Sequence, residues 1–238
     1  MPHVKQSFKT ALLGILMLCG SLAQAETERA AYDVYVSGIK IGELQYAVAQ
    51  SGNSYSSSGV LQSTGIVGAI AKYRYKATSQ GTLQNGTYRP QRYTESSDTG
   101  RRKMEQSITY RNGLPRVNSS KLAKPYWADP SDQKGTVDPM TGIIATLADQ
   151  PKSSPCTSKI DIFDGARRVQ VTLSNAKISG QSLSCRGLYK RVDGFNKSEL
   201  SEGVSFPFSL TYAAKGNVFR LNEFTIQTLR GRARFVRQ

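Results

Sequence analysis

The stretch Tyr32–Gln50, YDVYVSGIKIGELQYAVAQ, decides the fold. Apolar and polar residues alternate on both sides of Ser37-Gly38. Alternation of this kind around a short turn is typical of a β-hairpin with one apolar face. The hairpin raises the question of what that face covers, either the protein's own side chains or a cavity for a bound molecule.

The apolar positions of the hairpin change phase in its second strand. Ile39 and Ile41 occupy odd positions, whereas Leu44 and the apolar residues after it occupy even ones. In a flat strand this slip would turn half of the apolar side chains toward water. A β-bulge at Gly42 would absorb the slip and bend the strand. We therefore expect the apolar face to be the inside of a curved wall.

The rest of the chain predicts more strands and one main helix. Strand-like runs recur with turn signals such as Asn85-Gly86 and Asp164-Gly165 between them, and the last predicted strand spans Val218–Arg234. The helix is predicted over Asp138–Asp149, with Asp138 as N-cap and Pro139 in the first turn. Its buried face would hold Met140, Ile143, Ile144 and Leu147. The fold class is all-β with one main helix. It would be a large bent antiparallel sheet or a nearly closed barrel, with the helix packed against it.

The first 25 residues have the pattern of a secretory signal peptide. Lys5 and Lys9 precede a short apolar run, and Ala23-Gln24-Ala25 has the small residues of a cleavage site. We expect cleavage after Ala25, a periplasmic location, and a single β-rich domain over residues 26–238. No later segment is apolar enough to predict a transmembrane span.

Few reactive side chains would remain after cleavage. The one histidine of the chain, His3, lies in the predicted signal peptide, so a catalytic site with imidazole is not expected. Cys156 and Cys185 predict a structural disulfide in an oxidising compartment, worth about 3.5 kcal/mol by chain entropy. Asp161 and Asp164 do not converge as a glycosidase pair would. We expect no catalytic residues, no cofactor and no metal.

The chain is strongly basic, with a formal net charge of +15. Outside the cytoplasm the partner of such a charge would be a lipid or an anionic envelope polymer rather than nucleic acid, although a basic surface with no specific partner is the simpler explanation. Arg101 and Arg102 at a turn could clamp phosphate or carboxylate groups, although basic residues also keep exposed strands soluble. Together with Tyr93 and Trp127, the only tryptophan, they are the candidate ligand-binding residues.

A series of motifs occurs in order along the chain. They are YDVYVSGIKIGEL, RPQRYTESSDTGRRK, TVDPMTGI, IDIFDGARR, CRGLYKRVDGF, FPFSLTY and LRGRAR. This order resembles the domain of unknown function 3108 family, a set of secreted bacterial proteins. The resemblance covers about Tyr32 to Arg234 and implies an all-β envelope protein. It carries over no catalytic residue.

Two functions follow as hypotheses. The first is a non-catalytic binding or carrier protein for an amphiphilic or anionic envelope component. The second is a structural or interaction module that binds a protein or cell-wall partner through its surface. A cavity of ligand size favours the first, whereas a solid interior with an exposed apolar patch favours the second. A hydrolase without histidine would need two carboxylates, or a serine and a lysine, converging in a cleft.

Overall fold

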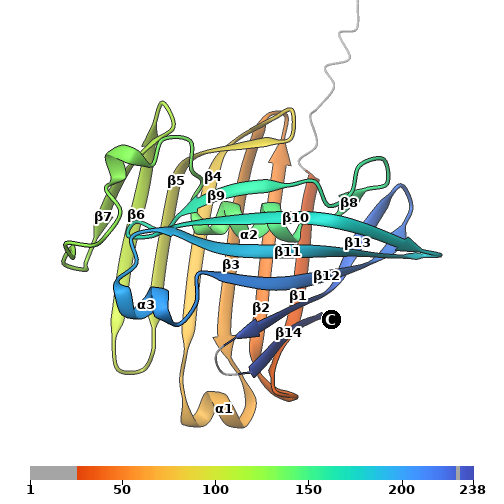
Figure 1. The fold of residues 1–238 in the computed structure, drawn as a ribbon, viewed down its shortest axis with the longest axis horizontal. Helices are drawn as coiled ribbons and strands as arrows, with labels where there is room; N and C mark the ends of the chain where they lie inside the picture. Colours follow the sequence, from red (N-terminus) through yellow and green to blue (C-terminus); the bar gives the residue numbers. More distant parts are fainter. Residues whose placement is uncertain (1–25, 229–230) are drawn as a thin grey trace, which may run out of the picture.

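The computed structural model of the 238-residue chain describes residues 26–228 and 231–238. The predicted signal peptide, residues 1–25, lies outside the described residues. Figure 1 shows a broad sheet whose two halves face one another, with a helix between them. Within the described part, no helix has the length and apolarity needed to cross a membrane.

One antiparallel sheet of 14 strands makes up most of the molecule. The strands are β1 Glu26–Val36, β2 Ile39–Ser51, β3 Ser54–Ser63, β4 Arg74–Gln84, β5 Thr87–Asp98, β6 Lys103–Arg111, β7 Leu114–Ser119, β8 Gln150–Pro151, β9 Lys159–Phe163, β10 Arg168–Ser179, β11 Ser182–Asp193, β12 Ser205–Lys215, β13 Val218–Thr228 and β14 Gly231–Arg237. Their order is β7-β6-β5-β4-β3-β2-β1-β14-β13-β12-β11-β10-β9, and β8 pairs with β13. The predicted strand over Val218–Arg234 is thus two strands, β13 and β14.

Four short helices interrupt the described strands. They are α1 Gly65–Ile70, the 3-10 turn η1 Pro130–Asp132, α2 Pro139–Leu147 and α3 Lys197–Ser201. The predicted helix over Asp138–Asp149 is confirmed as α2, with Asp138 as its N-cap. The fold class is therefore confirmed: a large bent antiparallel sheet that does not close, with one main helix packed against it.

The opening hairpin forms β1 and β2 and contains the predicted irregularity. Val34 pairs with Gly42 and Tyr35 pairs with Lys40, so Ile41 is the extra residue of a bulge. The bulge lies one residue before the predicted position. Because of the bulge, Ile39, which pairs with Val36, lies on the same face of β2 as Gly42, which pairs with Val34. The bend that the sequence predicts is therefore built around Ile41 and Gly42.

The two edges of the sheet are joined by a seam rather than by a strand ladder. The Gln106 side chain on β6 donates from Nε2 to the Asp164 carbonyl oxygen at 2.5 Å. In the loop before α2, the Ala128 amide donates to the Ala166 carbonyl at 2.9 Å, and a parallel bridge joins Val137 to Ile162. The sheet is therefore an almost closed barrel with α2 near the seam.

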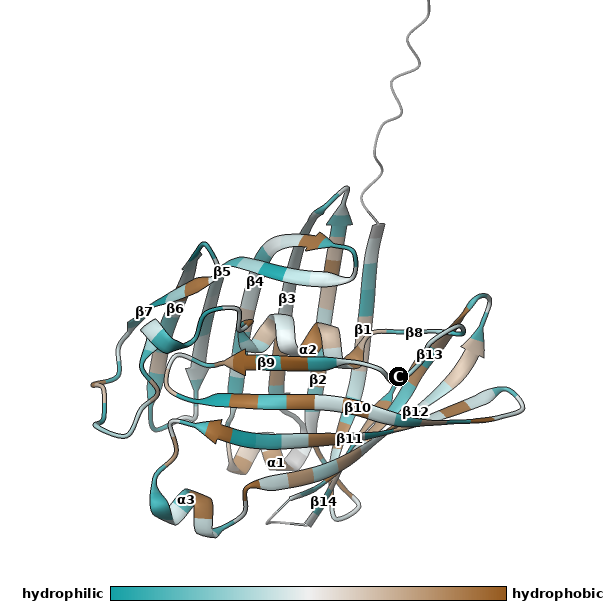
Figure 2. Ribbon diagram, turned by 45° about the horizontal axis from the view of Figure 1, so that its top comes forward, coloured by the Kyte–Doolittle hydropathy of each residue, from teal (hydrophilic) through white to brown (hydrophobic). Residues whose placement is uncertain are grey.

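The core lies on the inner face of the curved sheet. Alternate residues of each strand point inward, and Figure 2 shows the resulting alternation of hydrophobic and hydrophilic positions along the strands. The largest fully buried side chains include Tyr32, Tyr93, Tyr212 and Phe163. The predicted disulfide joins Cys156 to Cys185 on β11, with Cα atoms 5.6 Å apart, and both cysteines are buried.

Candidate functional site: an apolar cavity beside helix α2

Helix α2 is held by a buried polar cluster at its N-terminus. The Asp138 carboxylate accepts from the Thr141 amide at 2.9 Å and from the Thr141 hydroxyl at 2.7 Å. It also accepts from Ser79 Oγ on β4 at 2.7 Å, and Tyr55 OH on β3 lies 2.7 Å from Thr141 Oγ1. The cluster fastens the start of the helix to the sheet, because each of its polar groups has a partner there.

Burial changes the acidity of this cluster. The Asp138 side chain has no exposed surface, and loss of water raises the pKa of its carboxyl group although the hydrogen bonds oppose the rise. Burial also raises the pKa of Tyr55 to about 12. Both groups are fixed by contacts inside the protein, so we assign the cluster a role in positioning α2.

The helix faces both halves of the sheet. Met140, Ile144 and Leu147 are buried, as predicted, and Ile143 is partly buried. A Cβ at Gly142 would lie 2.4 Å from Ile162 Cδ1 on β9, so the Ile162 side chain would have to move to admit it. The absence of a side chain lets α2 approach this edge strand closely.

An apolar cavity of about 410 Å³ remains between α2 and the sheet. Strands from both halves of the sheet contribute side chains, and most of these are aliphatic or aromatic. The lining comprises Leu44, Gly59, Val60, Leu61, Tyr73, Tyr75, Ala77, Met140, Gly142, Ile143, Thr146, Leu147, Ile162, Val171, Tyr189, Phe208, Phe224, Ile226 and Phe235. Its volume lies within the range of about 300–1,000 Å³ that is typical of small-molecule sites.

Two of the polar side chains at the cavity wall, those of Tyr75 and Thr146, are already bonded within the protein. Tyr75 presents its ring to the cavity and donates its hydroxyl to Glu95 Oε2 at 2.7 Å. Tyr93 donates to the same oxygen at 2.5 Å. Thr146 donates to the Gly142 carbonyl at 2.7 Å. The cavity therefore offers apolar surface with little demand for hydrogen bonds, which suits a hydrocarbon chain.

The cavity reaches the surface at one end. Tyr73, which follows α1, lines the cavity and is 39% exposed. Tyr73 directly precedes β4 and Tyr75 is the second residue of that strand, and both line the cavity. The structure buries Tyr75 only in part and leaves Tyr73 as part of the opening.

The four predicted ligand-binding residues do not meet in one site. Arg101 and Arg102 lie in the exposed turn between β5 and β6. Tyr93 is fully buried behind Tyr75, and Trp127 is in the loop before η1. None of the four lines the cavity. A direct ligand-binding role for them stays a prediction.

The residues that line the cavity were missed because the sequence shows only alternation. The aromatic residues Phe208, Phe224 and Phe235 occupy positions whose alternation predicts an inward face, but they come from three strands. Only the pairing of β12, β13 and β14 brings them together, with ring centroids 5.2 and 5.3 Å apart.

The acidic residues considered for catalysis have structural partners. Asp161 accepts from Arg168 and Gln170 at 3.2 Å, and Asp164 accepts from the Ala166 and Arg167 amides within the β9–β10 turn. In the described residues, no three His, Cys, Asp or Glu side chains are grouped so that they could hold a metal ion.

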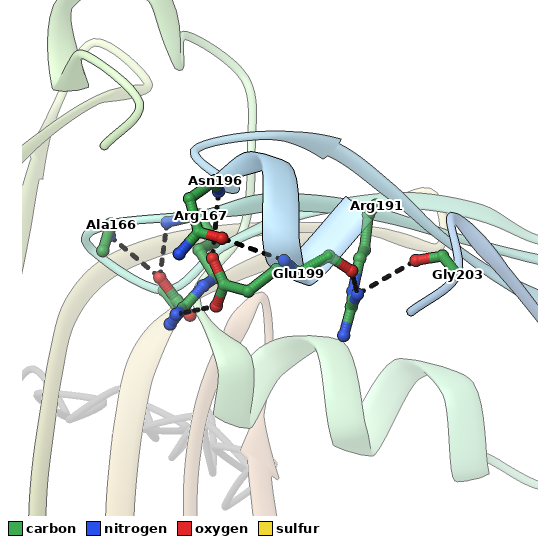
Figure 3. A network of polar contacts seen from close by, with 7 residues as sticks. Ala166, Arg167, Arg191, Asn196, Glu199 and Gly203 are labelled. Carbon is green, nitrogen blue, oxygen red and sulfur yellow. Dashed lines mark hydrogen bonds and ion pairs between the residues drawn. The ribbon is translucent and has the colours of Figure 1, made fainter. Parts of the chain in front are cut away.

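A second polar network fastens α3 to the sheet (Figure 3). Glu199 pairs with Arg167 at 2.5 Å and completes a capping box with Asn196. Arg191 donates to the carbonyls of Glu199 and Gly203, and its guanidinium lies 5.0 Å from the ring centroid of Phe206. Each charged group in this network is used within the protein, so the network is a structural joint.

These features define the class of the protein: an all-β, barrel-like protein with an apolar cavity beside its main helix. The chain belongs to the family described as Protein of unknown function (DUF3108), whose model matches residues 31–192. It is similar in fold to the crystal structure of a beta-barrel-like protein of domain of unknown function DUF1849 from Brucella abortus. The TM-score is 0.50 and the identity 11%, over 88% of this chain and 94% of that chain. No curated protein matches the sequence.

Proposed function

We propose that the protein binds an amphiphile of the cell envelope non-catalytically and holds its hydrocarbon portion in the cavity beside α2. The observation that carries the proposal is the apolar cavity of about 410 Å³. Burial of apolar surface is favourable by about 25 cal/mol per Å², so an acyl chain placed there would be stabilised without any polar contact. The proposal includes a periplasmic location, in line with the predicted signal peptide.

The position of the opening supports an amphiphile over a wholly apolar ligand. Tyr73 at the opening is followed by Arg74, and the turn that carries Arg101 and Arg102 lies close by. A chain in the cavity would leave an anionic head group near these cations. Cationic side chains form strong hydrogen bonds with phosphate and carboxylate groups.

The test is to fill the cavity. Ile143 is partly buried on α2 and lines the cavity, so Ile143→Trp should occupy its volume. We expect wild-type protein to bind cis-parinaric acid, a fluorescent fatty acid, and to carry an amphiphile in native mass spectra after purification from its own envelope. Ile143→Trp should weaken binding about tenfold or more and remove the co-purified species.

The matched control is Ile178→Trp. Ile178 is 56% exposed on the β10–β11 hairpin and does not line the cavity. It should bind the fatty acid as wild type does. If wild-type protein neither binds the fatty acid nor carries an amphiphile, or if Ile143→Trp binds like wild type, the proposal is wrong. Crosslinking in intact cells would then test the alternative, a module that binds a protein or cell-wall partner.

A further inference from the structure

Exposed apolar residues lie on the segments next to Tyr73, at the opening of the cavity. Ile70 at the end of α1 is 82% exposed and Ile39 at the start of β2 is 63% exposed. Tyr73 is the third member. The Thr64 amide donates to the Ile41 carbonyl at 3.3 Å, and the Ser63 amide donates to the Tyr73 carbonyl at 2.9 Å. The first contact places α1 beside the start of β2. The second places the residues before and after α1 beside one another.

Helix α1 is poorly explained by the fold alone. It has six residues, too few to be stable in isolation. Its N-cap Thr64 makes no side-chain cap hydrogen bond, and Ile70 contributes almost nothing to the core. Single exposed apolar side chains are common, but a group at the opening of an apolar cavity marks a surface that contacts something else.

Cations frame the same surface. Lys72 lies two residues after α1, and a Cβ built at Gly100 in the β5–β6 turn would lie 3.6 Å from Lys72 Cβ. Lys72 also forms a 3.7 Å ion pair with Asp98, the last residue of β5. Four further cations are exposed there and form no ion pair within the described chain: Arg74, Arg101, Arg102 and Lys103. We call this surface the basic rim: the apolar residues Ile39, Ile70 and Tyr73 with the cations Arg74, Arg101, Arg102 and Lys103.

We infer that the basic rim docks on the surface of a bilayer that contains anionic phospholipid. Exposed apolar side chains that enter the interface and cations that meet anionic head groups are the two contributions that hold a protein at such a surface. The charge complementarity selects an anionic membrane over a second copy of the chain, because a second basic rim would be repelled. Docked in this way, the opening beside Tyr73 faces the lipid.

The docking surface goes beyond the proposed function and does not depend on it. A membrane-facing opening would let an amphiphile pass between bilayer and cavity without crossing water. The basic rim can nevertheless be tested without any ligand in the cavity, so the two proposals can fail separately.

The test is co-sedimentation with vesicles of phosphatidylcholine alone and with about 30% phosphatidylglycerol. All variants are full chains purified as the cells produce them, with the same N-terminus established by mass spectrometry. We expect wild-type protein to bind the anionic vesicles, and binding to weaken as salt is raised. The double variant Arg101→Ala/Arg102→Ala should bind about 30-fold more weakly, and Ile70→Asp about tenfold more weakly.

Matched controls come from the β10–β11 hairpin, which lies well apart from α1 in Figure 1. Ile178→Asp and the double variant Lys177→Ala/Arg186→Ala change exposed residues of the same kinds and should bind as wild type does. The inference is overturned if these controls lose as much binding as the basic-rim variants, or if wild-type protein binds neutral and anionic vesicles equally.

A dimer that is disrupted by Ile70→Asp, with no vesicle binding, would overturn membrane docking and assign the basic rim to a second copy of the chain.

The variant Ile143→Trp separates docking from fatty-acid binding. It should bind the vesicles like wild type although it cannot bind the fatty acid. Vesicle binding that persists in a wild-type protein with no affinity for the fatty acid would leave the docking surface standing and remove the proposed function.

Discussion

Asp138 shows how one residue links the sequence to the position of the cavity. Its place before Pro139 predicts an N-cap, and the structure confirms that role. The sequence does not predict that the carboxylate is also the centre of a buried cluster with Ser79 and Thr141, because Ser79 is 59 residues away. The cap therefore sets both where α2 begins and where it lies on the sheet.

Asp138 should make stability depend on pH in an unusual direction. Burial raises its pKa above the ordinary value of 3.8 in the folded state. Between pH 3.8 and the higher folded-state pKa, Asp138 loses its proton in the unfolded chain but keeps it in the folded one. The stability supplied by protonated Asp138 is therefore lost progressively as pH rises toward the folded-state pKa. Each unit of pKa shift corresponds to about 1.4 kcal/mol.

The measurement compares wild type with Asp138→Asn, which keeps the N-cap but does not titrate. Urea unfolding at a series of pH values gives the free energy of unfolding of both proteins. We expect the difference, wild type minus variant, to fall as pH rises above about 4. The comparison cancels carboxylates such as Glu223, whose pKa is lowered by Arg234. A difference that stays flat or rises with pH contradicts the assignment.

At the scale of the element, the bulge in β2 bends the opening hairpin. Gly42 pairs with Ser63 on β3, and a Cβ at Gly42 would lie 2.3 Å from the Gln62 carbonyl oxygen. The residue that follows the bulge must therefore lack a side chain. The close approach of β2 to β3 occurs next to the strand end that leads into α1.

Gly42→Ala should destabilise the protein by about 2 kcal/mol, because the added methyl group collides with backbone that cannot move freely. Gln45→Ala, an exposed change on the same strand, should alter stability by less than about 0.5 kcal/mol. Urea unfolding measures both. A Gly42→Ala protein as stable as Gln45→Ala would show that the strand can shift there without cost.

The comparison between β2 and α1 shows what the sequence can predict at this scale. Alternation, turn residues and one phase slip predict β2, its bulge and its inner face, since these depend on neighbours in the chain. Helix α1 follows Thr64, whose side chain makes no cap hydrogen bond, and its six residues are too few for a helical period to show. The division between β13 and β14 falls in a run that reads as one strand. The cavity depends on which strands pair across the sheet. The sequence therefore predicts the curved wall but not which inward-facing residues meet at the cavity.

At the scale of the whole molecule, the open question in the sequence was whether the sheet closes. A single ladder of strands would have closed it and fixed the width of the interior. Instead the sheet ends at β7 and β9, and side-chain and loop contacts join the two edges. Helix α2 lies beside this seam, which leaves room for the cavity on the inner face.

The seam makes a prediction about how the whole barrel opens. Gln106 is buried on β6 and donates to the Asp164 carbonyl, so Gln106→Ala leaves that oxygen without its partner. The cost should be about 1–2 kcal/mol of local stability. Because the hydrogen bond joins the two halves of the sheet, amide hydrogen exchange should accelerate about 5- to 30-fold in β7 and β9 and much less in β2 and β13.

Glu105→Ala changes the neighbouring exposed side chain on the same strand and should leave exchange in β9 unchanged. Equal acceleration throughout the sheet in Gln106→Ala would mean that the two edges do not separate independently of global unfolding, and that the seam is part of one cooperative core.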